Sequence, residues 1–280
     1  MRLRLGWVAL ALVGATACRL GSVAIVLPTS TPLPPTPVLP TATVPAPTPT
    51  ETPEPAVAEG GRPEAILLLE PAPGSLLMSP LHIEGIADST FEQNLVLRLV
   101  LDDGTEIARQ ATTIQAELGQ RGPFASDLAF ILTREQQAFL QVFATSPKDG
   151  SIQHLASAGV RLSRFGPPDI RRLEPHPERL ELRIPRVGDV IRGGIARVRG
   201  FGLAGFEQTL LVEIYDAEGK LAGSSPAIVE APDLGQPGPF AVDVPYALSA
   251  YGPGRVVVRD VSPAFGGDSH LVSVDVDLQP

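Results

Sequence analysis

The stretch Leu118-Gly119-Gln120-Arg121-Gly122-Pro123-Phe124 returns later in the chain as Leu234-Gly235-Gln236-Pro237-Gly238-Pro239-Phe240, with six of the seven positions identical. Each copy reads as a Gly/Pro turn that leads into a strand. A proline forces an extended backbone on the residue before it and is tolerated at the first position of a strand. Two such turns in matching surroundings indicate a duplicated domain.

The residues around the first copy alternate as short antiparallel strands do. Every second residue from 95 to 101 is Leu, and Asp102-Asp103-Gly104 then supplies a hairpin turn. After the Gly-Pro turn, Phe124, Leu128 and Phe130 fall on one face of the next strand. About seven such strands, with a turn signal roughly every ten residues, predict an antiparallel β-sandwich.

The second unit repeats this plan. Phe206-Glu207-Gln208 matches Phe91-Glu92-Gln93, and His270-Leu271 matches His154-Leu155. We align residues 170–175 with residues 66–71, which leaves an insertion of about eleven residues between Pro175 and Gly200. We expect Phe91 and Phe206 to plug one end of each sandwich, and ligand recognition by these two segments is the alternative.

The N-terminus predicts export. Arg2 and Arg4 precede an apolar run, which ends in Ala15-Thr16-Ala17-Cys18, so residues 1–17 are predicted to be a signal peptide. The small residues before Cys18 resemble the lipobox of bacterial lipoproteins, although Ala15 stands where Leu is more common. The resemblance implies cleavage before Cys18 and a diacylglyceryl thioether on its sulfur.

Two other interpretations of this segment remain open. The first is an inert, buried Cys18. The second is an uncut membrane anchor over residues 5–27, which places Arg19 in the bilayer at a cost of roughly 2.5–3.5 kcal/mol. With or without cleavage, Arg2 and Arg4 keep the N-terminal end inside, so we expect an extracytoplasmic protein anchored to the outer face of the cell membrane.

Residues 18–62 are predicted to be the lipid-anchored N-terminus and a disordered Pro/Thr-rich linker. Between residues 28 and 55, prolines recur every two to five positions, which favours polyproline II. At ~3.1 Å per residue, this segment reaches roughly 90 Å when extended. We interpret it as a spacer; a ligand for a proline-binding domain and a glycosylated stalk are the alternatives.

Several short motifs occur together in the first unit: Glu70-Pro71, Ser79-Pro80-Leu81, Gly85, Phe91-Glu92, Asp103-Gly104, Gly122-Pro123-Phe124 and Ser146-Pro147-Lys148-Asp149-Gly150. Together they resemble the immunoglobulin-like domain of bacterial spore-germination proteins. The second unit keeps fewer of them, so its assignment depends on the internal repeat. The resemblance implies an all-β chain of two tandem immunoglobulin-like antiparallel β-sandwiches, residues 63–164 and 169–280, without catalytic residues.

The sequence presents no catalytic motif. Gly267-Asp268-Ser269 is similar to the surroundings of some serine nucleophiles, but Ser269 precedes a terminal strand, where a polar turn is the ordinary explanation. The four histidines are far apart and form no metal-binding spacing, so we expect no metal site and no cofactor. Calcium in the acidic hairpin turns is left open, although the spacing of an EF-hand is absent.

Charge excludes one class of partner and suggests another. The net charge of −9 argues against nucleic acid. Residues 171–199 hold eight arginines against four acids, whereas residues 200–280 hold three basic and eleven acidic residues. These charges either neutralise each other across neighbouring strands or leave a binding patch at Arg183, Arg186 and Arg192 for an envelope partner.

The sequence therefore predicts a non-enzymatic envelope lipoprotein. Its two modules would bind or scaffold a protein or glycan at the cell surface. The alternative is an accessory lipoprotein that positions a separate surface enzyme or transporter.

Overall fold

The structure, a computed structural model, describes residues 61–205 and 207–280. The predicted signal peptide, the lipid attachment at Cys18 and the Pro/Thr-rich linker as far as residue 60 lie outside the described residues. Within the described ranges the chain is all β, with one short 3-10 helix, η1 (Phe91–Gln93), and no α-helix. No helix in these ranges is long and apolar enough to cross a membrane.

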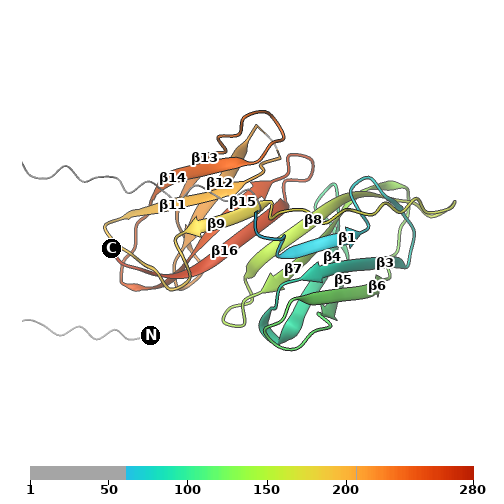
Figure 1. Ribbon diagram of the computed structural model, residues 1–280, viewed down its shortest axis with the longest axis horizontal. Helices are drawn as coiled ribbons and strands as arrows, with labels where there is room; N and C mark the ends of the chain where they lie inside the picture. Colours follow the sequence, from blue (N-terminus) through green and yellow to red (C-terminus); the bar gives the residue numbers. More distant parts are fainter. Residues whose placement is uncertain (1–60, 206) are drawn as a thin grey trace, which may run out of the picture. The chain divides into compact units, whose positions relative to one another are not determined.

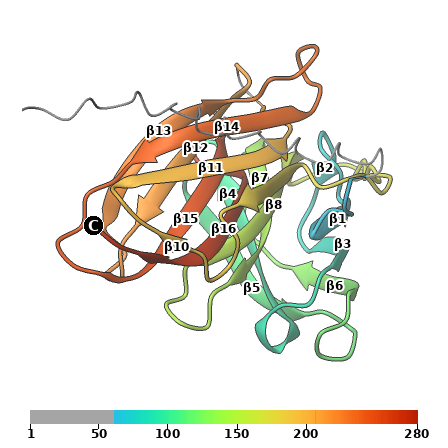
Figure 2. The same cartoon turned by 60° about the vertical axis from the view of Figure 1, so that its left-hand side comes forward.

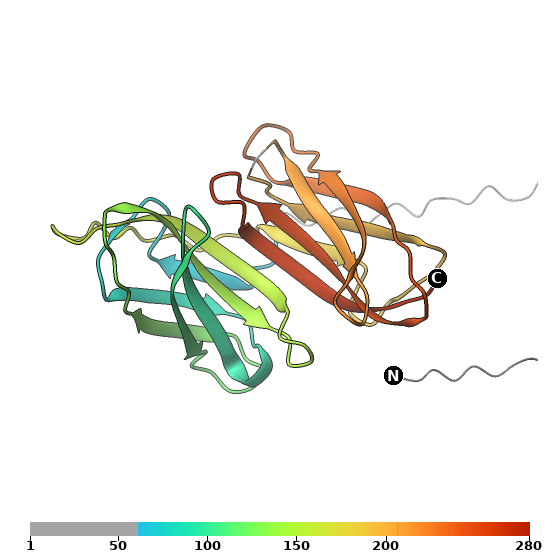
Figure 3. The ribbon, with the colours of Figure 1, turned by 180° about the vertical axis from the view of Figure 1, so that it is seen from behind.

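The first sandwich is built from eight strands (Figure 1). They are β1 (Ile66–Glu70), β2 (Leu76–Leu77), β3 (Leu81–Ala87), β4 (Asn94–Leu101), β5 (Glu106–Thr113), β6 (Gly122–Leu128), β7 (Gln136–Thr145) and β8 (Ile152–Leu162). Strands β1, β3 and β6 form one sheet, and β8, β7, β4 and β5 form the other, with β2 paired to β8. Figure 3, the view from behind, shows the larger sheet.

The second sandwich repeats this plan strand for strand (Figure 2). Its strands are β9 (Leu180–Ile184), β10 (Val190–Ile191), β11 (Ile195–Gly202), β12 (Thr209–Tyr215), β13 (Leu221–Ile228), β14 (Gly238–Pro245), β15 (Gly252–Val261) and β16 (Asp268–Leu278). The small sheet has the order β14-β11-β9, and the large sheet has the order β13-β12-β15-β16, with β10 paired to β16. The prediction of an all-β sandwich architecture is confirmed.

Each sandwich has its own apolar core between its two sheets. In the first, Leu95, Leu97 and Leu99 are fully buried, as their alternation predicts. Leu210, Val212 and Ile214 occupy the equivalent positions of β12 and are also fully buried. The described residues nevertheless belong to a single compact unit, because strands of the two sandwiches pair directly.

The repeated Gly-Pro-Phe stretch starts a strand in both units. Gly122 and Gly238 are the first residues of β6 and β14, and Phe124 and Phe240 are 1% and 2% exposed. The loop before β6 is held by Gln93, whose Nε2 donates to the carbonyl oxygens of Ala116, Glu117 and Gln120 at 3.2, 2.8 and 3.0 Å. The Phe-Glu-Gln motif and the Gly-Pro-Phe motif of the first unit therefore form one hydrogen-bonded loop structure.

The expectation that Phe91 plugs the first sandwich is wrong, because its side chain is 56% exposed. The same expectation for Phe206 falls outside the described residues. Gln93 is the buried member of that motif, at 3% exposure. Glu92 and Gln93 both have positive φ, 54° and 56°, which turns the Phe91 side chain outward and the Gln93 amide inward. The equivalent Gln208 donates to the carbonyl oxygen of Asp233 at 3.2 Å.

The alignment of residues 170–175 with residues 66–71 is also wrong. The counterpart of β1 is β9, because β1 pairs with β3 and β9 pairs with β11 at the same place in the small sheet. In sequence, this aligns Pro63-Glu64 with Pro177-Glu178 and Pro71 with Pro185. The insertion of about eleven residues therefore does not lie inside the second sandwich: the offset between equivalent residues grows only from 114 (Pro63 and Pro177) to 116 (His154 and His270). Most of the additional residues lie in the connection that precedes β9.

Candidate functional site

The junction of the two sandwiches is formed by strands that are equivalent in the two repeats. The last strands, β8 and β16, pair antiparallel, and Leu155 lies opposite Leu271. On either side of this pair, His154 lies opposite Val272 and Ala156 lies opposite His270. Because each histidine precedes the equivalent leucine, the pairing has a local pseudo-two-fold axis between Leu155 and Leu271.

A second crossing obeys the same symmetry. Pro63 and Pro177, at equivalent positions before β1 and β9, form an antiparallel bridge. The backbone N–H of Glu64 donates to the carbonyl oxygen of His176 at 3.4 Å, and the N–H of Glu178 donates to that of Arg62 at 2.8 Å. These two bonds are symmetry mates, so the segment before each small sheet crosses to the other sandwich.

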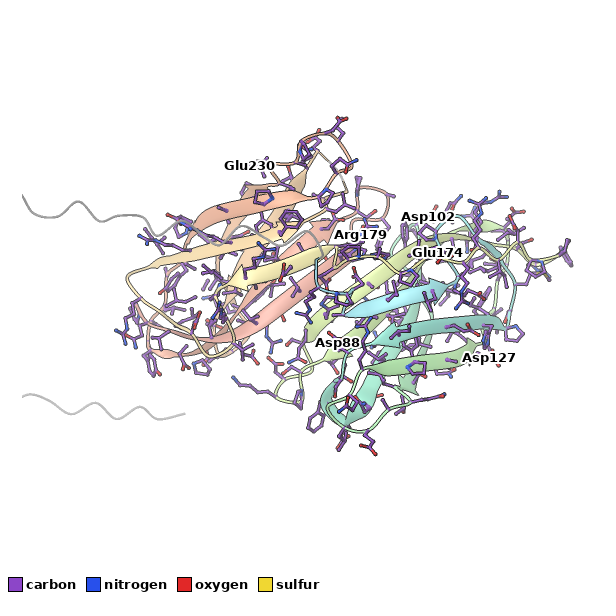
Figure 4. All side chains as sticks on the ribbon, in the orientation of Figure 1. Asp88, Asp102, Asp127, Glu174, Arg179 and Glu230 are labelled. Carbon is purple, nitrogen blue, oxygen red and sulfur yellow. The ribbon has the colours of Figure 1, made fainter. Side chains whose placement is uncertain are left out.

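The two glutamates exchange side-chain hydrogen bonds at this crossing. Glu178 Oε2 accepts from the backbone N–H of Ala65, and Glu64 Oε2 accepts from that of Arg179, both at 2.8 Å. Their side chains are only 0% (Glu64) and 4% (Glu178) exposed. Each carboxylate is thus fixed by the neighbouring sandwich and directs its Oε1 inward. Figure 4 labels Arg179, which immediately precedes β9.

Histidines approach the free oxygens. His154 Nε2 lies 3.5 Å from Glu178 Oε1 and 3.9 Å from Glu64 Oε1, and His270 Nε2 lies 3.8 Å from Glu64 Oε1. These separations are too long for hydrogen bonds. Among the described residues, Glu64 Oε1, Glu178 Oε1 and His154 Nε2 are buried without a hydrogen-bond partner.

The third histidine of the junction contacts the other oxygen of Glu64. His176 Nδ1 lies 3.6 Å from Glu64 Oε2 and 2.8 Å from the carbonyl oxygen of Pro177. The three histidines that are distant in sequence therefore converge, and only His82 stands apart, beside Asp127 and Glu84.

Burial makes the protonation of this cluster unusual. Burial, reinforced by the charge of Glu64, raises the pKa of Glu178 to about 7. For Glu64, burial is outweighed by His154 and His270, and its pKa is lowered. Burial first, and then the charge of Arg179, lower the pKa of His270 to about 3. Near neutral pH His270 is therefore neutral, and the Glu178 carboxyl group is partly protonated.

The cluster forms part of the wall of a groove with a volume of about 590 Å³. Residues of both sandwiches line it. Its apolar wall includes Ile66, Leu68, Leu173, Phe201 and Leu203, and its polar wall includes Arg62, Glu64, His176, Glu178, Arg183 and His270. This junction is the candidate functional site.

The arginines predicted to form a binding patch are not gathered in one hollow. Arg183 belongs to β9, lines the junction groove and pairs with Glu181 at 2.8 Å. Arg192 lines a separate hollow beside β10, and Arg186 lines neither of these two hollows. The predicted insertion of about eleven residues around these arginines is absent, because the offset between the repeats grows by only one residue between Pro185 and Gly200.

Other charges near the junction are neutralised locally. Arg259 binds both Glu213, at 2.8 Å, and Asp268, at 2.7 Å. Arg255 binds Asp275 at 2.8 Å and reaches Asp149 of the first sandwich at 3.2 Å. Asp268, beside the Ser269 considered above, thus has a structural partner.

Sequence reasoning missed Glu64, Glu178, His154 and His270 as members of one site. The signal was present in the repeat, because both histidines precede equivalent leucines and both glutamates follow equivalent prolines. The wrong alignment of the second unit concealed the glutamates.

One comparison with known protein families agrees with the fold of the first sandwich. A family model described as the immunoglobulin-like domain of bacterial spore germination matches residues 65–151. No curated protein matches the chain.

Solved structures with similarity include red sea bream transglutaminase, at 8% identity and a TM-score of 0.27, over 77% of this chain and 31% of that chain. Dimeric latent PorU from Porphyromonas gingivalis has 10% identity and a TM-score of 0.22, over 77% of this chain and 24% of that chain. Bovine butyrophilin has 10% identity and a TM-score of 0.22, over 77% of this chain and 99% of that chain. The chain therefore spans less than a third of the transglutaminase. The family match confirms the resemblance seen in the sequence: the first sandwich contains an immunoglobulin-like domain of the bacterial spore-germination type.

Proposed function

We propose that this protein is a non-enzymatic binding protein of the cell envelope, which holds an extended segment of a partner protein in the groove between its two sandwiches. The immunoglobulin-like domain supports a binding or scaffolding role in general. The observation that supports the specific proposal is the groove itself, since both sandwiches line its walls.

The lining favours a protein segment over a glycan. Leu173, Phe201 and Leu203 offer partly exposed apolar surface, which suits apolar side chains of a bound chain. Arg62 and Arg183 add charge beside that surface. The paired strands and exchanged hydrogen bonds fix both walls before binding, which lowers the entropic cost of association.

We also propose that the N-terminus positions this groove outside the cell membrane. A lipid on Cys18 would anchor the chain, and the Pro/Thr-rich segment would set its reach. Partition into the detergent phase and the mass of the mature N-terminus, compared between wild type and Cys18→Ala, test the anchor. An unmodified, water-soluble N-terminus in the wild type would contradict it.

The groove is tested by a charge placed on its apolar wall. We expect Leu173→Arg to reduce capture of one stoichiometric envelope protein by at least about tenfold, because it places a charge against a bound apolar chain. Ile131→Arg is the matched control, since Ile131 is 89% exposed and lies outside the groove. Equal capture by both variants would contradict the groove.

The class of partner is tested separately. If the chain binds purified wall polymer and retains no envelope protein, the partner is a glycan and not a protein. Arg183→Ser, Arg186→Ser and Arg192→Ser are combined to test the arginine patch. If binding to isolated envelopes is unchanged in that variant, the three arginines do not form the binding surface.

A further inference from the structure

The buried Glu/His cluster at the junction has the composition of a metal site. Glu64 Oε1, Glu178 Oε1 and His154 Nε2 lie within 4.8 Å of one another. His270 Nε2 lies 3.8 Å from Glu64 Oε1 and adds a second imidazole. We propose that Glu64, His154, Glu178 and His270 bind one divalent transition metal ion of the Zn²⁺ class, which links the two sandwiches.

The first argument is the state of the donor atoms. Glu64 is fully buried, yet its Oε1 has no hydrogen-bond partner among the described residues, and the same holds for Glu178 Oε1 and His154 Nε2. Each unsatisfied buried polar group costs about 1–3 kcal/mol, and charged groups cost more. Three such atoms directed at one another require a common partner.

The second argument is distance. The separations of 3.5, 3.8 and 3.9 Å between these donors exceed a hydrogen bond. Bonds of about 2.0–2.2 Å from zinc to N and O ligands give tetrahedral ligand–ligand separations of about 3.3–3.6 Å. Glu64, Glu178 and His154 are therefore close to the required spacing, whereas His270, which approaches Glu64 Oε1, must move further inward to complete the site.

The third argument is preorganisation. The second oxygen of each glutamate is fixed by a backbone N–H of the opposite sandwich, at 2.8 Å in both cases. Outer hydrogen bonds of this kind orient metal ligands and are part of functional metal sites. The free oxygens are thus held in place before an ion binds.

The donor set also selects the class of ion. Two imidazole nitrogens and two carboxylate oxygens suit zinc and neighbouring transition metals, whereas calcium and magnesium prefer oxygen ligands alone. Arg179, whose positive charge acts on His270, adjoins the cluster and opposes the binding of a second cation. An ion held only by charge would therefore be weakly bound, whereas an ion that bonds to imidazole gains from His154 and His270.

The repeat explains why four ligands meet. Glu64 and His154 come from the first sandwich, and Glu178 and His270 are their counterparts in the second. A ligand pair near a two-fold axis becomes a four-ligand site when the axis joins two copies. The site depends on the junction and not on any partner in the groove.

The test uses the full chain, purified in detergent without a polyhistidine tag, stripped with a chelator and titrated with Zn²⁺. We expect one ion per chain by elemental analysis, and a rise in Tm of about 5–10 °C at a hundredfold excess over Kd. Co²⁺ in place of Zn²⁺ should give the visible absorption of a tetrahedral site.

The variants identify the ligands. Glu178→Gln keeps an oxygen acceptor for the Ala65 N–H but removes the charge, and His154→Gln removes an imidazole. We expect each to weaken Zn²⁺ binding by at least about 100-fold, as ligand loss exceeds the loss of an outer hydrogen bond. The matched controls Glu181→Gln and His82→Gln, which change a half-buried and an exposed residue outside the cluster, should bind Zn²⁺ as the wild type does.

Two results would overturn the proposal. One is a wild-type chain that binds no stoichiometric Zn²⁺ and shows no shift in Tm, which would mean that the cluster is satisfied by shared protons. The other is equal binding by the wild type, the ligand variants and the controls, which would place the ion elsewhere on the surface. The wild-type titration decides the question even if a ligand variant fails to fold.

Discussion

Leu155 of β8 lies directly opposite Leu271 of β16, and the two leucines hold the same position in the two repeats. They pack with Phe143 and Val257 into a small apolar cluster that belongs to neither sandwich core. A contact in which a surface meets its own counterpart is the isologous arrangement of two-fold dimers. The tandem domains therefore meet as two identical subunits would, with the connection between them added.

This apolar cluster should couple the unfolding of the two sandwiches. Leu155 is fully buried, so Leu155→Ala removes buried methyl groups and leaves a cavity, which costs about 2–5 kcal/mol. We expect a single calorimetric transition in the wild type and two separated transitions in the variant. Leu221→Ala is the control, because Leu221 is 48% exposed. Two transitions already present in the wild type would contradict this coupling.

Gln93 should be the residue that orders the loop before β6. Its Nε2 is the shared donor for three backbone carbonyl oxygens, and Gln93→Ala leaves all three without it. We expect a loss of about 2–3 kcal/mol, since the three carbonyl oxygens are only partly buried and each hydrogen bond lost costs about 0.5–1.5 kcal/mol.

Hydrogen exchange measures the effect of Gln93→Ala locally. The amides of residues 116–122 should lose protection, while those of the second sandwich should not. Gln110→Ala serves as the control, because Gln110 is exposed and donates only to the hydroxyl of Ser126. Unchanged exchange in the loop would show that the Gln93 amide does not hold it.

The fold was largely predictable because its signals are local. The leucines of β4 alternate at the period of a strand, and the Gly-Pro turns lie where strands begin. The duplication was visible because both units keep Gly-Pro-Phe and Phe-Glu-Gln. Positions that need positive φ or close packing accept few other residues, so these two motifs survive in each copy. The prediction for Phe91 was wrong because an apolar residue beside a turn resembles a core residue. Positive φ at Glu92 and Gln93 instead directs the Phe91 side chain outward and the Gln93 side chain inward.

The candidate site was not predictable in the same way. Its ligands come from positions 64, 154, 178 and 270, and no spacing in the sequence brings them together. They meet because β8 pairs with β16 and because the segments before β1 and β9 cross. Both contacts are between domains, and an alternating pattern within a strand carries no information about its partner at a sheet edge.

Asp149 should give the junction a dependence on acid pH. Burial raises its pKa, but hydrogen bonds from the Ser151 hydroxyl and N–H, together with the charge of Arg255, outweigh burial and lower the pKa to about 2. A carboxylate with a lowered pKa stabilises the folded state above its unfolded pKa, near 4, and loses this contribution as pH falls towards 2.

The difference in unfolding free energy between wild type and Asp149→Asn should therefore be constant from pH 5 to 7 and shrink between about pH 4 and 2. Its plateau should not exceed about 1 kcal/mol, because the Asp149 side chain is 50% exposed and solvent screens the pair. Asp102→Asn, in an exposed hairpin turn, is the control. A difference that persists at pH 2 would contradict the role of ionised Asp149.

A side chain added to the glycine that faces the phenylalanine of each Gly-Pro-Phe stretch should destabilise that sandwich. A Cβ at Gly85 would overlap the ring of Phe124 and the carbonyl oxygen of Leu67, and a Cβ at Gly200 would overlap Phe240 and the carbonyl oxygen of Glu181. Because the ring and the backbone leave no free space, we expect Gly85→Ala and Gly200→Ala each to cost about 3 kcal/mol in unfolding free energy, measured by denaturant titration.

Gly159→Ala is the matched control for these variants. A Cβ there would meet Phe139 at 3.5 Å, an ordinary contact, and alanine in a strand is about 0.5–1 kcal/mol more favourable than glycine. Its stability should therefore stay the same or rise. In the Gly85→Ala background, Phe124→Leu should recover part of the loss, because it removes the ring but leaves the Leu67 carbonyl oxygen. Additive losses in the double variant would show that the ring is not what requires glycine at position 85.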